Sequence, residues 1–222
     1  MRESPSTAWP VVLSAPSGAG KTTIARALVE REDDFAFSVS ATTREPRMGE
    51  VHGVDYCFLS EPDFLTMVED GAFAEWAKVH GDLYGTPRES LLSAGRGGRH
   101  VVLDIDVQGA LQIREAVPEA LLLFILPPSV ESLFRRLTGR GTEKEDTLRR
   151  RLNTALHELK AAAAFDFFVI NEDLDEAVSE VRDLARGGEA PPEGPSGKLE
   201  DVIELLEGIK ALLQRNQLVE DN

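Results

Sequence analysis

The sequence predicts an α/β fold, a doubly wound parallel sheet with helices on both faces. Apolar runs recur along the chain, and each is followed by a segment compatible with a helix: 11–13, 101–103, 121–126 and 167–170. Buried strands alternating with helices are typical of a parallel sheet covered on both sides. Ligands of such folds bind beyond the carboxyl ends of the strands. We therefore expect the loops that follow these runs to carry the binding site.

The first apolar run leads into a loop with the composition of a phosphate cradle. The loop and the helix start comprise Ala15, Pro16, Ser17, Gly18, Ala19, Gly20, Lys21, Thr22 and Thr23. Backbone N–H groups of such a loop can converge on an anion, Lys21 can reach the β- and γ-phosphates, and the Thr22 hydroxyl can ligate Mg²⁺. Ala15 stands where the strict pattern has glycine, and an ordinary strand–turn–helix with a surface lysine is the alternative. The motif predicts a nucleoside triphosphate ligand but not the reaction.

Two insertions interrupt the alternation of strands and helices. Residues 35–97 consist of short alternating pieces separated by Gly- and Pro-containing turns, a pattern that predicts an inserted, largely antiparallel lobe with some helix. The helical pattern breaks again at residues 138–142, which predicts a lid over about 138–155. The core would then comprise residues 9–34 and 98–186. Two insertions beside a phosphate cradle suggest an acceptor-binding lobe and a mobile lid.

A linker and a helix follow the predicted core. Residues 187–198 are rich in Gly and Pro and predict a flexible linker. Residues 199–216 predict an amphipathic helix whose apolar stripe is Leu199, Val202, Leu206, Ile209 and Leu213, widened by Leu205 and Leu212. Such a short stripe needs a partner surface, either the chain's own core or a second chain. Its alternating spacing of three and four favours self-association, so we expect a homo-oligomer formed through this helix.

Composition limits the classes of partner. The 222 residues carry a formal net charge of −15, which argues against nonspecific binding to nucleic acid or anionic membranes. No apolar run approaches the roughly 20 residues needed to cross a bilayer, and the first residues lack a signal-peptide core. We expect a cytoplasmic protein. The lone Cys57 and the four histidines show no metal-ligand spacing.

Local arginines and aspartates are the remaining candidates for ligand chemistry. Arg44 and Arg47 lie three residues apart in a loop, where guanidinium groups suit a mononucleotide phosphate; a solvated basic turn is the alternative. Asp104 and Asp106 are two apart at the end of a predicted strand and therefore share a face. We assign Asp104 to organising hydrated Mg²⁺, while helix capping is the structural alternative.

Several ordered motifs resemble the guanylate kinase family. They are the segment from Ser40 to Tyr56 (Ser-Ala-Thr-Thr-Arg-Glu-Pro-Arg-Met-Gly-Glu-Val-His-Gly-Val-Asp-Tyr), Glu75-Trp76-Ala77, Tyr84-Gly85-Thr86, 103–109 and 139–142. The resemblance spans roughly residues 9–186. It implies transfer of the ATP γ-phosphoryl group to GMP, with Mg²⁺ as cofactor and small molecules as partners. The alternatives are a noncatalytic protein-interaction module of similar fold and a P-loop kinase for another nucleoside monophosphate.

The resemblance also implies an acceptor site. The GMP phosphate would be held by two arginines and two tyrosines: Arg44, Arg47, Tyr56 and Tyr84. Glu75 would accept hydrogen bonds from the guanine edge, with Asp106 beside it, while Ser40 and Thr86 would meet the other polar positions. Adenine has no donor at N1 or C2, so a carboxylate there selects against it.

The donor side would use a further set of residues. The resemblance implies that lid arginines neutralise charge between the two sets of phosphates: Arg136, Arg140 and Arg151. Together with Lys21 and Arg44 these are the expected catalytic residues. Asn171 matches an adenine-edge position, although a turn-forming asparagine would look the same. Thr22 would ligate Mg²⁺ directly and Asp104 through water.

Overall fold

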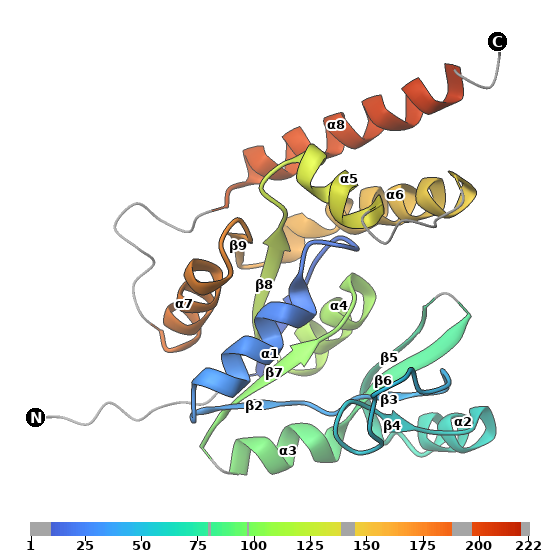
Figure 1. The fold of residues 1–222 in the computed structure, drawn as a ribbon. Helices are drawn as coiled ribbons and strands as arrows, with labels where there is room; N and C mark the ends of the chain where they lie inside the picture. The colour runs from blue at the N-terminus through green and yellow to red at the C-terminus, as the bar shows by residue number, and fades with distance from the viewer. Residues whose placement is uncertain (1–9, 80, 97, 139–144, 188–196, 219–222) are drawn as a thin grey trace, which may run out of the picture. The chain divides into compact units, whose positions relative to one another are not determined.

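The computed structural model describes residues 10–79, 81–96, 98–138, 145–187 and 197–218 (Figure 1). The chain divides into two compact units. Unit 1 comprises Met1–Val12 and Leu28–Leu121, and unit 2 comprises Leu13–Ala27 and Leu122–Asn222. Strand β1 (Pro10–Ser14) begins in unit 1 and ends in unit 2, and helix α1 (Lys21–Arg31) does the reverse.

A five-stranded sheet contains all four apolar runs of the sequence. Its strand order is β2-β7-β1-β8-β9. The strands besides β1 are β2 (Phe35–Phe37), β7 (His100–Asp104), β8 (Leu121–Leu126) and β9 (Phe167–Ile170). β2 runs parallel to β7, and β8 runs parallel to β9. The middle of β1 and nearly all of β8 are fully buried, as continuous apolar strands in a parallel sheet require. The predicted α/β class with a parallel sheet is confirmed.

Unit 1 also contains a second, mixed sheet with the order β4-β3-β6-β5. Its strands are β3 (Ala41–Thr42), β4 (Cys57–Phe58), β5 (Phe73–Val79) and β6 (Asp82–Pro87). β5 and β6 pair antiparallel, while β3 and β4 pair parallel. Helix α2 (Glu61–Glu69) places Phe64 against Phe73 in a small buried cluster with Ala41 and Leu83. Because β2 pairs with β7, the lobe expected over residues 35–97 contributes its first strand to the larger sheet.

Two more helices complete unit 1. They are α3 (Arg88–Arg96) and α4 (Val107–Ala116). α4 packs against β5, and the Gln112 side chain fastens the two together. Its Nε2 donates to the carbonyl of Trp76 at 2.9 Å, and its Oε1 accepts from the Trp76 N–H at 3.2 Å. This pair of bonds holds the edge strand β5 beside the middle of α4.

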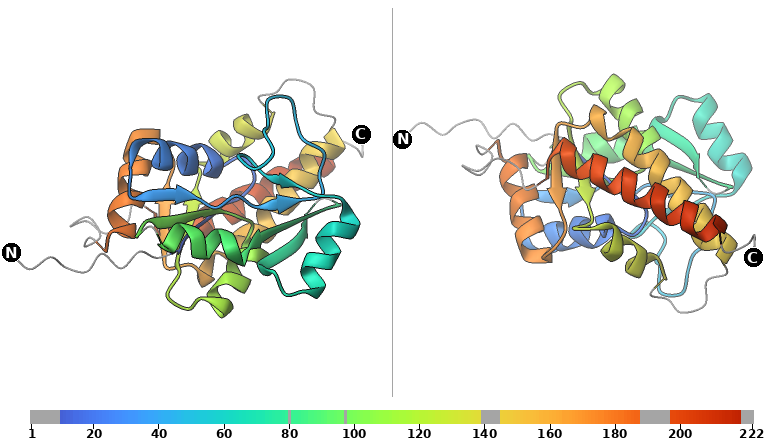
Figure 2. Two further views of the ribbon diagram at one scale, coloured as in Figure 1. Left: turned by 90° about the horizontal axis from the view of Figure 1, so that it is seen from below. Right: turned by 90° about the horizontal axis from the view of Figure 1, so that it is seen from above.

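Unit 2 surrounds its strands with helices and one short 3₁₀ turn, η1 (Ala162–Ala164). The helices are α5 (Val130–Thr138), α6 (Glu145–Lys160), α7 (Leu174–Ala185) and α8 (Leu199–Leu218). α8 contains the residues of the predicted C-terminal helix. It packs along α6 and against α5 (Figure 2). Most of the predicted linker lies outside the described residues. No helix in the described ranges is long and apolar enough to cross a membrane.

The apolar face of α8 differs from the predicted stripe. Val202, Leu205 and Ile209 are buried, whereas Leu199 is 47% exposed. The stripe is thus centred on Leu205 and is covered at least in part by the chain's own α5 and α6. Intramolecular docking, the alternative to self-association, accounts for this burial. Assembly through α8 stays a prediction that rests on the spacing of its apolar residues.

Candidate functional site

The cradle loop of unit 2 connects the end of β1 to the start of α1. Gly18 and Gly20 have φ angles of 90° and 97°, in the region that L side chains rarely adopt. The Ala19 N–H donates to the Pro16 carbonyl at 3.0 Å, and the Thr23 N–H donates to the Gly20 carbonyl at 3.1 Å. These turns bring the loop into the N-terminus of α1, where Lys21 and Thr22 lie in the first helical turn. Such a terminus favours an anion.

Asn171 and Arg136 hold the cradle loop by hydrogen bonds to its backbone. Asn171 Nδ2 donates to the Ala19 carbonyl at 2.7 Å, and a Cβ at Gly20 would collide with that same amide. Arg136 Nη1 donates to the Ala19 carbonyl and Nη2 to the Asn171 carbonyl, both at 2.9 Å. Burial, and to a smaller extent the charge of Arg135, lowers the pKa of Arg136. The structure thus brings Asn171 and Arg136 to the loop that the sequence identifies as the cradle.

Helix α6 contacts the same loop through two side chains seven residues apart. Arg151 Nη1 donates to the Leu137 carbonyl at 3.0 Å, and its Nη2 lies 3.5 Å from the Ser17 hydroxyl. Glu158 Oε2 accepts from the Ser17 N–H at 3.0 Å. Sequence reasoning assigned Arg151 but missed Glu158, although two helical turns place both on one face of α6. Arg140 lies outside the described residues.

In unit 1, Arg44 is held by a carboxylate that the sequence analysis left without a role. Arg44 Nη2 lies 2.9 Å and 3.0 Å from the two carboxylate oxygens of Glu50, while Nη1 donates to the Glu45 carbonyl at 2.7 Å. The Arg47 N–H also donates to Glu50, at 2.7 Å, although its side chain is exposed. The hydrogen bond from Arg44 is the main cause that lowers the pKa of Glu50. The loop therefore already arranges its donors around an anion.

The two tyrosines of the chain lie beside Arg44. The guanidinium carbon of Arg44 lies 5.5 Å from the Tyr56 ring centre, and the rings of Tyr56 and Tyr84 meet edge to face at 6.1 Å. Burial, with the Asp104 charge as the next cause, raises the pKa of Tyr56 to about 12. Tyr56 is therefore a protonated hydrogen-bond donor at neutral pH. Three of the four predicted phosphate-binding side chains are thus gathered.

A buried carboxylate lies deeper in unit 1. Glu75 is 4% exposed, and its Oε1 accepts a 2.6 Å hydrogen bond from the Thr86 hydroxyl of the neighbouring strand. Its Oε2 faces Gly109, where any Cβ would approach it closely. Asp106 caps α4 by accepting from the Gly109 N–H at 2.9 Å. Thr86 and the start of α4, which Asp106 caps, thus both lie beside Glu75, and the capping alternative for Asp106 is realised. Ser40 is buried just before β3.

The two predicted magnesium ligands, Thr22 in unit 2 and Asp104 in unit 1, both carry oxygen donors. Asp104 is the last residue of β7, and Thr22 is the second residue of α1. Hydroxyl and carboxylate oxygens suit Mg²⁺, which usually takes few protein ligands and relies on phosphates and water for the rest. Within the described ranges, no group of three or more His, Cys, Asp or Glu residues could hold a metal ion. The side chains of Thr22 and Asp104 are therefore of the chemical kind that Mg²⁺ binds.

A parallel α/β sheet whose first strand feeds a glycine-bearing cradle defines a P-loop nucleotide-binding protein. Comparison with known proteins gives the family. The family model described as Guanylate kinase matches residues 7–186. The chain belongs to the guanylate kinase family and is an enzyme of the phosphotransferase class.

Similar proteins share most of their length with this chain. It is 50% identical to a guanylate kinase of Caldanaerobacter subterraneus, over 78% of this chain and 84% of that protein. It is 51% identical to a guanylate kinase of Oleidesulfovibrio alaskensis, over the same shares. The crystal structure of guanylate kinase from Anaplasma phagocytophilum matches with a TM-score of 0.68 and 35% identity, covering 82% of this chain and 86% of that one. Helix α8 begins after the last residue of the family match.

Proposed function

We propose that this chain transfers the γ-phosphoryl group of ATP to GMP, with the cradle of unit 2 as the donor site and the lobe of unit 1 as the acceptor site. The single observation that carries the acceptor assignment is the buried Glu75 carboxylate, oriented by Thr86. Burying a carboxylate is costly unless hydrogen-bond donors satisfy it. The guanine N1–H and 2-amino groups supply such donors, and adenine does not. An enzyme for another nucleoside monophosphate would not need this group.

The acceptor phosphate would lie beside Arg44. Arg44, Arg47, Tyr56 and Tyr84 would bind it, two as fixed cations and two as phenol donors. Glu50 supports this role because it already holds the Arg44 guanidinium in a defined orientation. Ser40, Thr86 and Asp106 would complete the contacts to the base.

The donor phosphates would lie in the cradle. Lys21 would contact the β- and γ-phosphates, while Arg136, Arg151 and the expected Arg140 would neutralise charge that builds up during transfer. Asn171 would face the adenine edge. Thr22 would hold Mg²⁺ directly and Asp104 through water, and the bound ion would supply charge neutralisation at the β- and γ-phosphate oxygens.

The chemical step needs no general base. A GMP phosphate oxygen, already anionic at neutral pH, forms a bond to the γ-phosphorus while the bond from that phosphorus to the β–γ bridging oxygen breaks. The electron pair stays on the bridging oxygen, and ADP and GDP result. The chain's contribution is then alignment and charge stabilisation by Lys21 and the arginines. Closure of the expected lid would exclude water that otherwise hydrolyses ATP.

The interaction-module alternative is weak because the chain retains Gly20, Lys21 and Thr22 beside a full set of acceptor residues. Composition supports a cytoplasmic enzyme with small-molecule partners, and neither nucleic acid nor membrane is an expected partner.

A substrate panel tests the proposed function. ADP release is measured by a coupled assay with GMP, AMP, UMP and dTMP, each with and without Mg²⁺. We expect turnover with GMP and Mg²⁺ and at most a few per cent of that rate with the other nucleotides. Equal turnover of AMP would contradict the role of Glu75, and failure with every nucleotide would favour the interaction module.

A further inference from the structure

We infer that helix α8 is an intramolecular brace for the donor site, and that Gly208 is the residue that positions it. The helix lies beyond residue 186, where the family match ends. The family match therefore assigns no role to α8. The inference rests on the proposed function only because part of its test measures the KM for ATP and the KM for GMP.

α8 is anchored at its start and along one face. The Gly197 N–H donates to the Phe168 carbonyl of β9 at 3.2 Å, and the Lys198 N–H donates to the Asp201 carboxylate at 2.6 Å. From there Val202, Leu205 and Ile209 are buried, at 2%, 4% and 0% exposure. Burying this apolar face on α5 and α6 provides the energy of docking.

Gly208 sets the distance between α8 and α5. A Cβ at this position would collide with Cγ2 of Val130, the first residue of α5. Glycine is a poor helix former, so its place in the middle of a long helix needs a packing reason. The close approach to Val130 is that reason.

The two helices under α8 are those that fix the cradle. α5 carries Arg136, which binds the carbonyls of Ala19 and Asn171. α6 carries Arg151 and Glu158, which both reach Ser17. A shift of α5 or α6 would therefore move side chains that hold the cradle loop. Packed elements transmit such shifts because protein interiors are dense.

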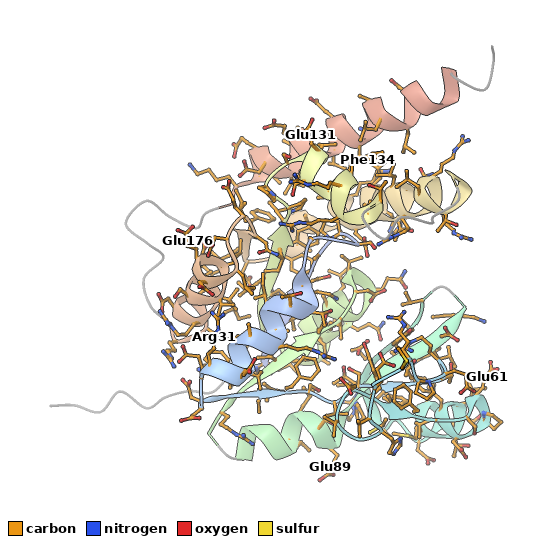
Figure 3. The ribbon with its side chains drawn as sticks, viewed as in Figure 1. Arg31, Glu61, Glu89, Glu131, Phe134 and Glu176 are labelled. Atoms are coloured by element: carbon orange, nitrogen blue, oxygen red, sulfur yellow. The ribbon has the colours of Figure 1, made fainter. Side chains whose placement is uncertain are left out.

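The contact between α8 and α5 borders a cavity. A cavity of about 480 Å³ lies between the two helices, lined among others by Val130, Glu131, Ile170, Leu205 and Leu212 (Figure 3 labels Glu131). The two helices are therefore not packed along their whole contact, and the point where Gly208 meets Val130 sets their spacing. Ile170 precedes Asn171, so the cavity adjoins the segment that contacts the cradle.

The test is Gly208→Ala in the full-length chain. At an ordinary helical site this change stabilises, but here we expect the melting temperature to fall by about 2–4 °C. We also expect the KM for ATP, and the Kd of a nonhydrolysable ATP analogue, to rise by about fivefold or more, with the KM for GMP unchanged. Lys210→Ala, at an exposed position of α8, is the matched control and should change none of these.

Two further variants complete the test. Val130→Ala removes the colliding methyl groups and should restore ATP affinity in the Gly208→Ala background. Leu205→Ala weakens docking without a clash and should raise the KM for ATP in the same direction. A higher melting temperature for Gly208→Ala, or a lower one with unchanged ATP affinity, would overturn the inference. If the wild type failed to phosphorylate GMP, the proposed function would fail, while the analogue Kd would still decide whether α8 is a brace.

Discussion

Thr86 donates a 2.6 Å hydrogen bond to Glu75, and both side chains are almost completely buried. The two residues face each other on the antiparallel strands β5 and β6. The hydrogen bond uses one lone pair of Glu75 Oε1 and fixes the plane of the carboxylate. Glu75 is therefore set in one orientation before any ligand binds.

Replacing this carboxylate tests how guanine is read. Glu75→Gln presents an amide donor to the guanine edge and should weaken GMP use by roughly 2–4 kcal/mol in kcat/KM. The Kd for ATP should stay near normal. Glu61→Gln, an exposed position of the same lobe, serves as the control. Unchanged GMP kinetics in Glu75→Gln would mean that guanine is recognised elsewhere.

Tyr56 gives a spectroscopic prediction. The chain has two tyrosines, and the pKa of Tyr56 is raised to about 12, mainly by burial. The ultraviolet difference titration between wild type and Tyr56→Phe should show no ionisation of Tyr56 up to about pH 11. An ionisation midpoint near 10 in that difference would contradict the buried position. Tyr56→Phe should also raise the KM for GMP by roughly tenfold, because a donor to a charged phosphate is lost.

The ion pair of Arg44 and Glu50 predicts a pH dependence of stability. Because the Arg44 hydrogen bond lowers the pKa of Glu50, its contribution is fully present above the usual glutamate pKa. That contribution is lost as the pH falls through the lowered pKa of the folded state. The difference in unfolding free energy between wild type and Glu50→Gln should therefore be present at pH 7 and shrink below about pH 4. A difference that grows on acidification would be the opposite result.

Asn171 predicts an effect on the donor side. Asn171→Ala removes the 2.7 Å hydrogen bond to the Ala19 carbonyl. The hydrogen bond from Arg136 to the same carbonyl is retained. We expect the KM for ATP to rise by roughly tenfold while the KM for GMP is unchanged. Asn153→Ala, which removes an exposed amide from α6, is the control. Equal kinetics for the two variants would show that Asn171 does not support the cradle.

The features that can be predicted from the sequence are those set by residues close to one another along the chain. The apolar strands, the cradle at Gly18–Gly20 and the helix of α8 follow from local pattern, and the structure contains them. The family resemblance assigns Glu75 and Asp106 to the base edge, and the structure places an oxygen atom of each side chain near Gly109.

Other features depend on contacts between distant residues, which no local pattern encodes. Glu158 meets Ser17 across 141 positions of sequence, so its role could not be inferred from its neighbours. Gly208 appears in the sequence only as an unfavourable helix residue, and its meaning depends on Val130 of another helix. The apolar pattern of α8 likewise does not show that Leu199 is exposed while Leu205 is buried, because that depends on the surface that the helix packs against.

The assignment of the loop before α1 as the ATP phosphate cradle is tested most directly by single-turnover transfer of the ATP γ-phosphoryl group to GMP by Lys21→Ala. Lys78→Ala, an exposed lysine of β5, is the matched control. We expect Lys21→Ala to lose on the order of 10²-fold or more in transfer rate, because the lysine charge stabilises the transition state more than the ground state. GMP binding should be unchanged, and Lys78→Ala should match the wild type. A Lys21→Ala enzyme that kept more than about a tenth of the wild-type rate would contradict the assignment of the cradle.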